Sequence, residues 1–358
     1  MLQLPLFHAS VLNDVHYGLP AVDQTRSAAE IADLVSYFPT VHLIGFPKCG
    51  SSTLYVLLTK IPGLLFPTPK DPAAPKYFLK EAHFFDDSAR YEKGLAFYGD
   101  FYPKLHQKEA KYVAVDATPS ILNLEALHSM SNVYDHHPHE HHFIISFREP
   151  FSALLSYWNH LREMPSKSDV FEDYLRKELS KNVSQCSPHA SWWQHRHKLS
   201  IENLESSFML HCPKMIGYYM FAIYLELWVR EFPLKSTNYC LFFMDDLAGD
   251  QNIVIQSLHK CLKLPEMESE LLPLKGVVRD NTANSYRPKH PVSTEVRAMV
   301  DALYQPWLCV LKSFLRGKFN KSRRRLNEIP WIPTGEQCYK LGLSFDENGP
   351  GTPMRDST

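Results

Sequence analysis

The chain has 358 residues, of which 44% are hydrophobic and 13% aromatic, so it can bury a sizeable core. Its 38 Lys and Arg nearly balance 39 Asp and Glu, and a formal net charge of −1 does not by itself indicate a polyanionic partner. No apolar run reaches the roughly 20 residues that span a bilayer, and the first residues lack the pattern of a secretory leader. We therefore expect a soluble globular protein whose basic sites are local.

The order of the predicted elements indicates an α/β fold. Residues 1–40 mix proline, polar and small residues and are expected to form an N-terminal extension around the domain. A buried strand is predicted at 41–46 and a helix at 51–60. Because strands alternate with helices, we expect a central, mainly parallel sheet flanked by helices, with ligands at the carboxyl ends of the strands. Further strands are predicted at 112–115, 142–147 and 239–244, with a helix at 215–230.

No linker divides the remaining sequence, so one domain is expected at residues 41–330, followed by a C-terminal extension at 331–358. Residues 62–75 contain five prolines and predict an irregular loop, whereas residues 164–182 have a charged, helical pattern. A basic segment at 317–325 and a polar tail at 346–358 do not suggest a second fold.

The seven cysteines are an odd number and lack both the short paired spacing of a zinc site and the density of a disulfide scaffold. They leave the redox compartment and any disulfide pairing open. Asn182-Val183-Ser184 and Asn320-Lys321-Ser322 are glycosylation acceptor patterns, which favour a lumenal compartment slightly.

The most informative stretch is residues 45–53, Gly-Phe-Pro-Lys-Cys-Gly-Ser-Ser-Thr, which joins the first predicted strand to the first predicted helix. Such a junction presents unpaired backbone N–H groups and the positive end of a helix to an anion, and Lys48 adds a full charge. Gly45 and Gly50 have the spacing of the common nucleoside-triphosphate loop, but Ser51 stands where that loop has its lysine. The expected phosphate-binding residues are Pro47, Lys48, Cys49, Gly50, Ser51, Ser52 and Thr53.

Pro-Lys-Cys-Gly-Ser-Ser-Thr resembles the 5′-phosphosulfate loop of sulfotransferases, which use 3′-phosphoadenosine 5′-phosphosulfate (PAPS). A second mark follows the third predicted strand, where Arg148 and Ser156 are spaced like the family's 3′-phosphate ligands. An Arg fork and a hydroxyl suit a phosphate dianion. Without the family, Arg148 would be expected to pair with Glu149 at a helix start, and Ser156 would be an ordinary buried serine. The resemblance implies a P-loop-like three-layer fold with PAPS as co-substrate.

Between these marks, Lys80-Glu81-Ala82-His83-Phe84-Phe85-Asp86 is similar to the Lys-Glu-x-His-Phe-Phe signature of the heparan-sulfate sulfotransferase branch, in which the Glu is the base. Transfer to a sugar hydroxyl needs a proton acceptor, so Glu81 is the first candidate and His83 the competitor. His83 could instead be a packed structural residue. Lys48 would stabilise charge on the leaving phosphate with support from Lys80, although a lone lysine is usually solvated.

Asp116-Ala117-Thr118-Pro119-Ser120 resembles a segment that borders the acceptor pocket, which makes Asp116 and Thr118 candidate substrate-binding residues. A turn that caps a helix explains the same two residues equally well.

Near the carboxyl end, Arg287 and Lys289 lie in a basic loop similar to the one that closes over the nucleotide in carbohydrate sulfotransferases. The resemblance makes them candidates to hold the 3′-phosphate of PAPS or the acceptor, although such a loop can also be merely solvated. A helical stretch is expected to end at a turn that contains Tyr304 and Pro306. The family often has Asn where Trp307 stands, and the loop lacks the glycine of the heparan-sulfate branch, so the acceptor stays open.

Five histidines between residues 136 and 142 could be mistaken for a metal site. His141 and His142 would point to opposite faces of a strand, whereas a metal needs three or four convergent ligands. No metal is expected, because the sulfuryl group of PAPS is already activated.

The marks extend over residues 41–316 and are most similar to the Golgi carbohydrate sulfotransferases of the heparan-sulfate and chondroitin branches, including the N-acetylgalactosamine 4-sulfate 6-O type. The resemblance implies sulfuryl transfer from PAPS to a glycosaminoglycan hydroxyl, with chondroitin or dermatan favoured over heparan sulfate. It also implies a Golgi location, a glycan rather than a nucleic-acid partner, and a membrane anchor that this chain does not show, so a soluble or secreted form is the alternative. Cations available for such an acceptor are Lys104, Lys108, Lys111, Arg287 and Lys289.

Two other classes of protein remain. A P-loop kinase or NTPase would need a lysine after Gly50 and a metal-binding acidic strand end. A non-catalytic glycan-binding descendant would keep a basic cleft and lose catalysis.

Overall fold

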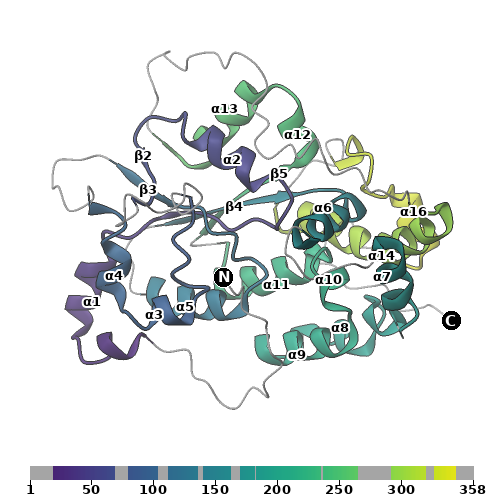
Figure 1. Ribbon diagram of the computed structural model, residues 1–358, viewed down its shortest axis with the longest axis horizontal. Helices are drawn as coiled ribbons and strands as arrows, with labels where there is room; N and C mark the ends of the chain where they lie inside the picture. Colours follow the sequence, from purple (N-terminus) through teal and green to yellow (C-terminus); the bar gives the residue numbers. More distant parts are fainter. Residues whose placement is uncertain are drawn as a thin grey trace.

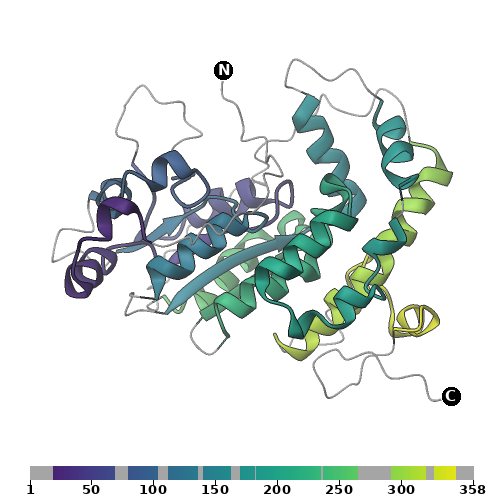
Figure 2. The same cartoon turned by 90° about the horizontal axis from the view of Figure 1, so that it is seen from below.

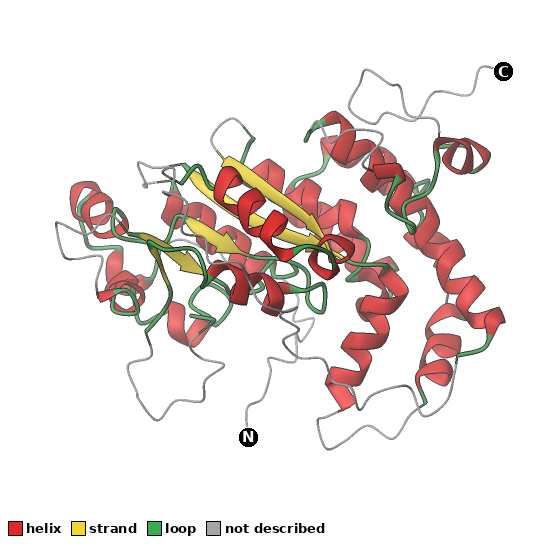
Figure 3. Cartoon of the chain, turned by 90° about the horizontal axis from the view of Figure 1, so that it is seen from above, coloured by secondary structure: helices red, strands yellow, loops and turns green. Residues whose placement is uncertain are grey.

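The computed structural model describes residues 19–68, 80–103, 112–135, 140–162, 170–181, 183–234, 237–264, 292–319 and 326–343. Within them the chain forms a five-stranded sheet in the order β2-β3-β1-β4-β5, in which every neighbouring pair is parallel. Helices cover both faces (Figures 1 and 3), so the predicted three-layer α/β fold is confirmed. The strands are β1 (Val41–Leu43), β2 (Leu64–Leu65), β3 (Val113–Asp116), β4 (His141–Phe147) and β5 (Thr237–Phe243).

Helices precede, separate and follow these strands. The α-helices are α1 (Ala28–Val35), α2 (Ser51–Leu58), α3 (Ser88–Tyr91), α4 (Leu95–Gly99), α5 (Leu124–Tyr134), α6 (Pro150–Arg162), α7 (Phe171–Leu179), α8 (Ser191–Gln194), α9 (Ile201–His211), α10 (Lys214–Gly217), α11 (Phe221–Glu231), α12 (Met244–Ala248), α13 (Gln251–Cys261), α14 (Thr294–Gly317) and α16 (Gly335–Lys340). Short 3₁₀ turns are η1 (Ala21–Asp23), η4 (Val183–Cys186) and η5 (Arg196–Lys198).

Different helices cover the two faces of the sheet, because successive strand residues point to opposite sides. Phe143, Ile145 and Phe147 of β4 belong to the larger hydrophobic core, with residues of α5 and α11. Ile144 belongs to the smaller core, with residues of α2 and α13. Every residue of β4 is buried, as expected for a parallel strand between two neighbours. The carboxyl ends of β1, β3 and β4 therefore meet at one edge of a rigid sheet.

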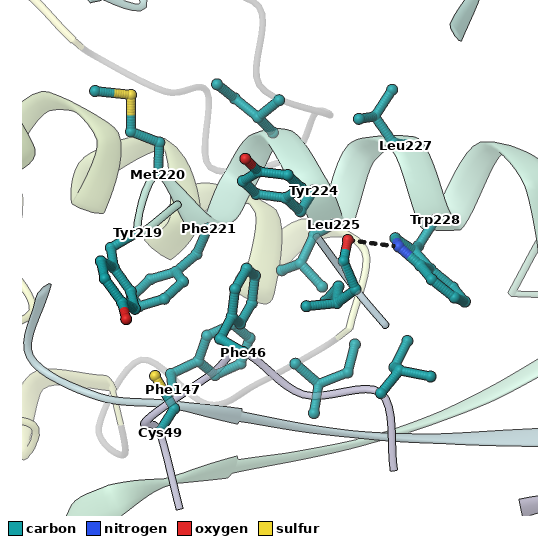
Figure 4. Packing of buried hydrophobic residues seen from close by; sticks show 14 of the residues in the cluster. Phe46, Cys49, Phe147, Tyr219, Met220, Phe221, Tyr224, Leu225, Leu227 and Trp228 are labelled. Atoms are coloured by element: carbon teal, nitrogen blue, oxygen red, sulfur yellow. Dashed lines mark hydrogen bonds between the residues drawn. The ribbon is translucent and has the colours of Figure 1, made fainter. Parts of the chain in front are cut away.

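Aromatic rings fill the core beneath that edge. Phe46, which follows β1, contacts Phe221 of α11 edge to face, with ring centroids 4.6 Å apart. Phe147, the last residue of β4, lies 5.3 Å from the same ring (Figure 4). Both Phe46 and Phe147 are fully buried. This packing holds the segment that leaves β1 against α11, on the face of the sheet that the larger core covers.

Several predicted boundaries were wrong. β1 ends at Leu43 instead of residue 46, and residues 62–75, predicted as an irregular loop, contain β2. The helix predicted at 215–230 is interrupted after Gly217. A Cβ added at Gly217 would lie 2.7 Å from Cζ of Phe208, so glycine at this break lets a ring of α9 approach the backbone closely. The helix predicted over 164–182 is described only at 170–181, where α7 covers 171–179; residues 164–169 and 182 lie outside the described residues.

The turn expected at Tyr304 and Pro306 is also wrong, because α14 continues through Pro306 (Figure 2, yellow-green). A proline inside a helix costs about 3 kcal/mol. Tertiary contacts offset that cost: the Tyr304 hydroxyl donates to the carbonyl oxygen of Ile216 at 2.7 Å, and the indole nitrogen of Trp307 donates to that of Cys186 at 2.6 Å. Both rings are almost fully buried, so packing overrides the local preference.

Six cysteines pair as Cys186–Cys212, Cys240–Cys261 and Cys309–Cys338, while Cys49 is free and buried. Disulfides persist in oxidising compartments, so these pairs indicate a secreted or lumenal protein. In the part of the chain that the structure describes, no helix has the length and apolarity to cross a membrane.

Candidate active site

The loop between β1 and α2 has the backbone shape of an anion-binding turn. Lys48 has a φ of 62° and Gly50, the N-cap of α2, has a φ of 98°, so both lie in the left-handed region. Such reversals turn consecutive N–H groups toward one side of a loop. The loop leads directly into the positive N-terminal end of α2, which favours an anion at the same place.

Three consecutive carbonyl oxygens of this loop accept hydrogen bonds from the protein. The Phe46 oxygen accepts from the Cys49 N–H at 3.2 Å. The Pro47 oxygen accepts from the Tyr219 hydroxyl at 3.2 Å, and the Lys48 oxygen accepts from Nη1 of Arg148 at 3.1 Å. Two side chains from outside the loop therefore hold it: Arg148, which lies between β4 and α6, and Tyr219, which lies between α10 and α11.

Replacing Gly50 by alanine is expected to lower the free energy of unfolding by about 1–3 kcal/mol. The added Cβ would lie 2.6 Å from Cδ1 of Leu247 and 2.9 Å from Sδ of Met244, and the left-handed φ would be strained as well. Gly342→Ala is the matched control, since Gly342 also has a positive φ, of 69°, but no atom within 4 Å of its added Cβ. Chemical denaturation should show a clearly larger loss for Gly50→Ala; equal losses would contradict the close packing of this loop.

The hydroxyl residues after Gly50 and the thiol before it differ in exposure. Ser51 and Thr53 are buried and Ser52 is half-buried in the first turn of α2. The Cys49 side chain is fully buried, and burial raises the pKa of its thiol far above the ordinary value, so it stays protonated and unreactive. Cys49 therefore contributes its backbone N–H to the loop rather than a reactive sulfur.

Arg148 lies at the loop, while its neighbour Glu149 turns away to begin α6. Glu149 accepts from the backbone N–H groups of Phe151 and Ser152, at 3.2 and 2.8 Å. It also pairs at 2.8 Å with Arg297 of α14. The alternative of an Arg148–Glu149 cap is therefore not what the structure shows: Glu149 caps the helix with Arg297 as its ion-pair partner. Ser156 lies further along α6 and is half-buried.

The segment of residues 80–86 meets the loop through Lys80. The Lys80 ammonium is 3.4 Å from the Ser51 hydroxyl oxygen and 2.9 Å from Oε1 of Glu81. Oε2 of Glu81 lies 2.9 Å from Nε2 of His83, and Nδ1 of His83 lies 2.9 Å from Oδ2 of Asp86. One continuous chain of contacts thus joins the anion-binding turn to a carboxylate that is only about one quarter exposed (24%).

The surroundings of His83 and Glu81 shift the pKa values of the two side chains in opposite directions. Burial alone would lower the pKa of His83, but hydrogen bonds and charges from Asp86 and Glu81 outweigh it and raise the pKa to about 10. Burial would raise the pKa of Glu81, but the hydrogen bond from His83 and the charge of Lys80 hold that pKa below its ordinary value. At neutral pH His83 is an imidazolium that donates from both nitrogens, and Glu81 is a carboxylate.

Stability should therefore depend on pH through His83. Because its pKa is raised from 6.5 to about 10 on folding, its contribution is fully present below pH 6.5 and is lost as pH rises through about 10. The contribution of Glu81 is also stabilising but has the opposite pH dependence: it is present above its ordinary pKa of 4.5 and is lost as pH falls from there through the lowered pKa. The free energy of unfolding of the parent and of His83→Asn, measured between pH 6 and 10.5, should converge at the alkaline end. A difference that stays constant across this range would contradict the protonated state of His83.

Asp116 and Thr118, the two predicted acceptor contacts, lie beside this segment but are buried, with only 4% and 7% of each residue exposed. Asp116 ends β3, and both of its carboxylate oxygens accept hydrogen bonds from within the protein. The Thr118 hydroxyl oxygen accepts from the His83 backbone N–H at 3.1 Å.

Five of the candidate site residues lie near one another through the contacts described above: Lys48, Lys80, Glu81, His83 and Arg148. Arg287 and Lys289, like Lys104, Lys108 and Lys111, lie outside the described residues. His136, His137 and His139 do so as well. Among the residues that the structure does describe, no three His, Cys, Asp or Glu side chains are grouped to hold a metal ion.

Sequence reasoning assigned no role to Asp86, Arg90, Tyr219 or Arg297. Asp86 had a usable signal, because it stands three residues after His83, a spacing at which side chains in a tight turn meet. Tyr219 and Arg297 are far from the site in sequence, and no local pattern marks them.

Comparisons with known proteins give no match in sequence and a distant likeness in structure. No protein-family profile matches the chain, and a search of curated proteins by sequence gave no match. Among solved structures, a sulfotransferase from Alicyclobacillus acidocaldarius is similar, with 18% identity and a TM-score of 0.47 over 78% of this chain and 96% of that one. The likeness is too distant to assign an activity, and the fold described above rests on this chain's own strand order.

Proposed function

We propose that this chain is a PAPS-dependent sulfotransferase that transfers a sulfuryl group to a hydroxyl of a glycan, with a glycosaminoglycan of the chondroitin or dermatan type as the favoured acceptor. The observation that carries the proposal is the position of Lys80. Its ammonium contacts both Ser51 in the first turn of α2 and the carboxylate of Glu81. These contacts support the proposal, because the loop expected to bind the anion and the carboxylate expected to accept a proton then lie side by side, as transfer from an anionic donor to an alcohol requires.

The residues present fit both anionic ends of PAPS. The left-handed loop and the N-terminus of α2 suit the 5′-phosphosulfate, with Lys48 and Lys80 as cations. Arg148 and Ser156 suit the 3′-phosphate, because a guanidinium has five N–H donors and keeps others after donating one bond to Lys48. PAPS supplies an activated sulfuryl group whose leaving group is adenosine 3′,5′-bisphosphate.

In the proposed reaction Glu81 accepts the proton of the acceptor hydroxyl. The hydroxyl oxygen forms a bond to sulfur while the bond from sulfur to the phosphate oxygen breaks, and negative charge moves to that phosphate. Lys48 stabilises this charge. The raised pKa of His83 means that this imidazolium has no lone pair for the proton, so it orients Glu81 and keeps it ionised. This assignment favours Glu81 over His83 as the general base.

The same proposal includes a lumenal site of action in the Golgi and a glycan partner. The three disulfides support an oxidising compartment, and Golgi glycan sulfation takes place in such a lumen. The acceptor would be a sulfated or uronate-bearing chain, for which local cations are needed.

The test is transfer of radioactive sulfate from PAPS to separate chondroitin, dermatan, heparan sulfate and neutral glycan acceptors by the full chain, secreted from eukaryotic cells. We expect label in chondroitin or dermatan in excess of heparan sulfate. Label only in neutral glycans would overturn the acceptor class. Magnesium-dependent ATP turnover without PAPS binding would overturn the sulfotransferase proposal in favour of a P-loop kinase or NTPase.

A further inference from the structure

The backbone at His83 is held in an unfavourable conformation. Its φ is 48°, in the left-handed region that non-glycine residues rarely adopt. Such residues persist only where surrounding contacts hold them, and they cluster at functional sites. The contacts that hold His83 therefore indicate what the protein keeps in place.

Two of these contacts act on the main chain from opposite sides. The Ala82 carbonyl oxygen accepts a hydrogen bond from the guanidinium of Arg90, near the end of α3. The His83 N–H donates to the Thr118 hydroxyl oxygen at 3.1 Å. Phe84 and Phe85, which follow, are buried against Tyr98, at ring-centroid distances of 4.6 and 5.1 Å. The turn that carries Glu81 and His83 is thus fixed at its backbone and anchored by aromatic packing.

Thr118 is in turn oriented by Asp116. Oδ1 of Asp116 accepts from the Thr118 hydroxyl at 2.6 Å and from the Thr118 N–H at 3.0 Å. Oδ2 accepts from the Tyr98 hydroxyl at 2.8 Å. Because the Thr118 proton points at Asp116, a lone pair of the Thr118 oxygen is left to receive the His83 N–H. The donor and the acceptor are therefore known for each hydrogen bond in the series that runs from Tyr98 through Asp116 and Thr118 to His83.

We propose that Asp116 and Thr118 are positioning residues, which hold the His83 backbone in its left-handed conformation and so aim the imidazole at Glu81 and Asp86, rather than residues that touch the acceptor. Their burial favours this role over the acceptor contact predicted from the sequence, since a residue that is 4% or 7% exposed offers little surface to a sugar. The catalytic consequence rests on the proposed function, whereas the effect on His83 does not.

The charged groups around His83 make its titration a direct readout of this positioning. Glu81 and Asp86 contact its two nitrogens. Lys80 pairs with Glu81, Arg90 of α3 contacts the neighbouring Ala82 carbonyl, and the buried Asp116 of β3 acts through Thr118. If the turn relaxes, His83 loses contact with both carboxylates, and its pKa falls from about 10 toward 6.5.

Thr118→Val is the test variant, because valine keeps the shape of threonine and removes the hydroxyl, and Thr118→Ser is the matched control that keeps it. Histidine-labelled protein is titrated by NMR, with the His83 signal assigned by its loss in His83→Asn. We expect the pKa of His83 to fall by at least one unit in Thr118→Val and to stay near that of the parent in Thr118→Ser. An unchanged titration in Thr118→Val overturns the proposal.

Kinetics provide the second readout. We expect kcat for sulfuryl transfer to fall at least tenfold in Thr118→Val, with KM for the acceptor changed less than twofold, and to recover in Thr118→Ser. A raised KM with unchanged kcat would instead identify Thr118 as an acceptor contact. If Thr118→Val does not fold, Tyr98→Phe removes one hydrogen bond to Asp116, and a His83 titration identical to the parent's then overturns the proposal. If the parent protein transfers no sulfuryl group, the proposed function is wrong. The NMR titration of His83 still tests the positioning role in that case.

Discussion

Replacing Glu81 by glutamine is expected to lower kcat for sulfuryl transfer about 10²- to 10⁴-fold, the range that a positioned general base contributes. Glutamine has nearly the same shape and can still accept from His83, but it cannot take the hydroxyl proton. The carboxylate is partly exposed and ionised, so the change removes a proton acceptor without opening the core. The Kd for PAPS, measured by calorimetry, should change by less than about threefold, because the donor's phosphates are bound by other residues.

The matched control is Glu92→Gln, which neutralises an exposed carboxylate just after α3 and should leave kcat within twofold of the parent. Full activity in Glu81→Gln would remove Glu81 from the mechanism. If the parent and Glu81→Gln were equally inactive toward every acceptor, while both bound glycans, the chain would be a glycan-binding module.

Replacing Lys48 by alanine is expected to lower kcat about 10²- to 10³-fold, comparable with the loss of one preorganised group that stabilises transition-state charge. Lys48 adopts a left-handed φ of 62° and is half-buried. Alanine also has a Cβ, so the backbone strain is similar in both proteins and the thermal unfolding temperature should change little. Single-turnover kinetics at saturating PAPS separate this effect from weaker donor binding.

Lys60→Ala is the control for Lys48, since Lys60 is exposed just beyond the other end of α2. Lys48→Arg should retain part of the rate, because it keeps the charge but alters its geometry. Normal turnover in Lys48→Ala would show that the charge on the leaving phosphate is stabilised elsewhere, and Lys80 would then be the first alternative.

Local patterns were sufficient for the parts of the fold that lie close together in sequence. The unit of strand, loop and helix around Lys48 was predicted because its apolar run, glycine and hydroxyl residues are consecutive. The strands at β3, β4 and β5 were predicted for the same reason, within three residues at each end. β2 was missed because it has only two residues and lies in a proline-rich stretch whose local signal indicates a loop.

Features that depend on distant contacts could not be read from the sequence. Pro306 argues for a helix end, and only the burial of Tyr304 and Trp307 explains why α14 continues. The left-handed turn at His83 is fixed by Thr118, 35 residues away, and cysteine spacing could not select one disulfide pairing among many. For Asp116 the sequence offered an acceptor contact or a helix cap, and neither includes its hydrogen bond from Tyr98.

In the loop between β1 and α2, the carbonyl oxygens of Phe46, Pro47 and Lys48 already accept hydrogen bonds, and this affects how the loop can bind a ligand. Each of these oxygen atoms already accepts a hydrogen bond, from Cys49, Tyr219 or Arg148, so its partial negative charge is directed at that donor and opposes an approaching anion less. The dipoles of the loop are therefore already oriented before any ligand arrives, so binding costs little reorganisation. Each new hydrogen bond to a ligand can then contribute fully to affinity, because the loop does not have to be ordered on binding.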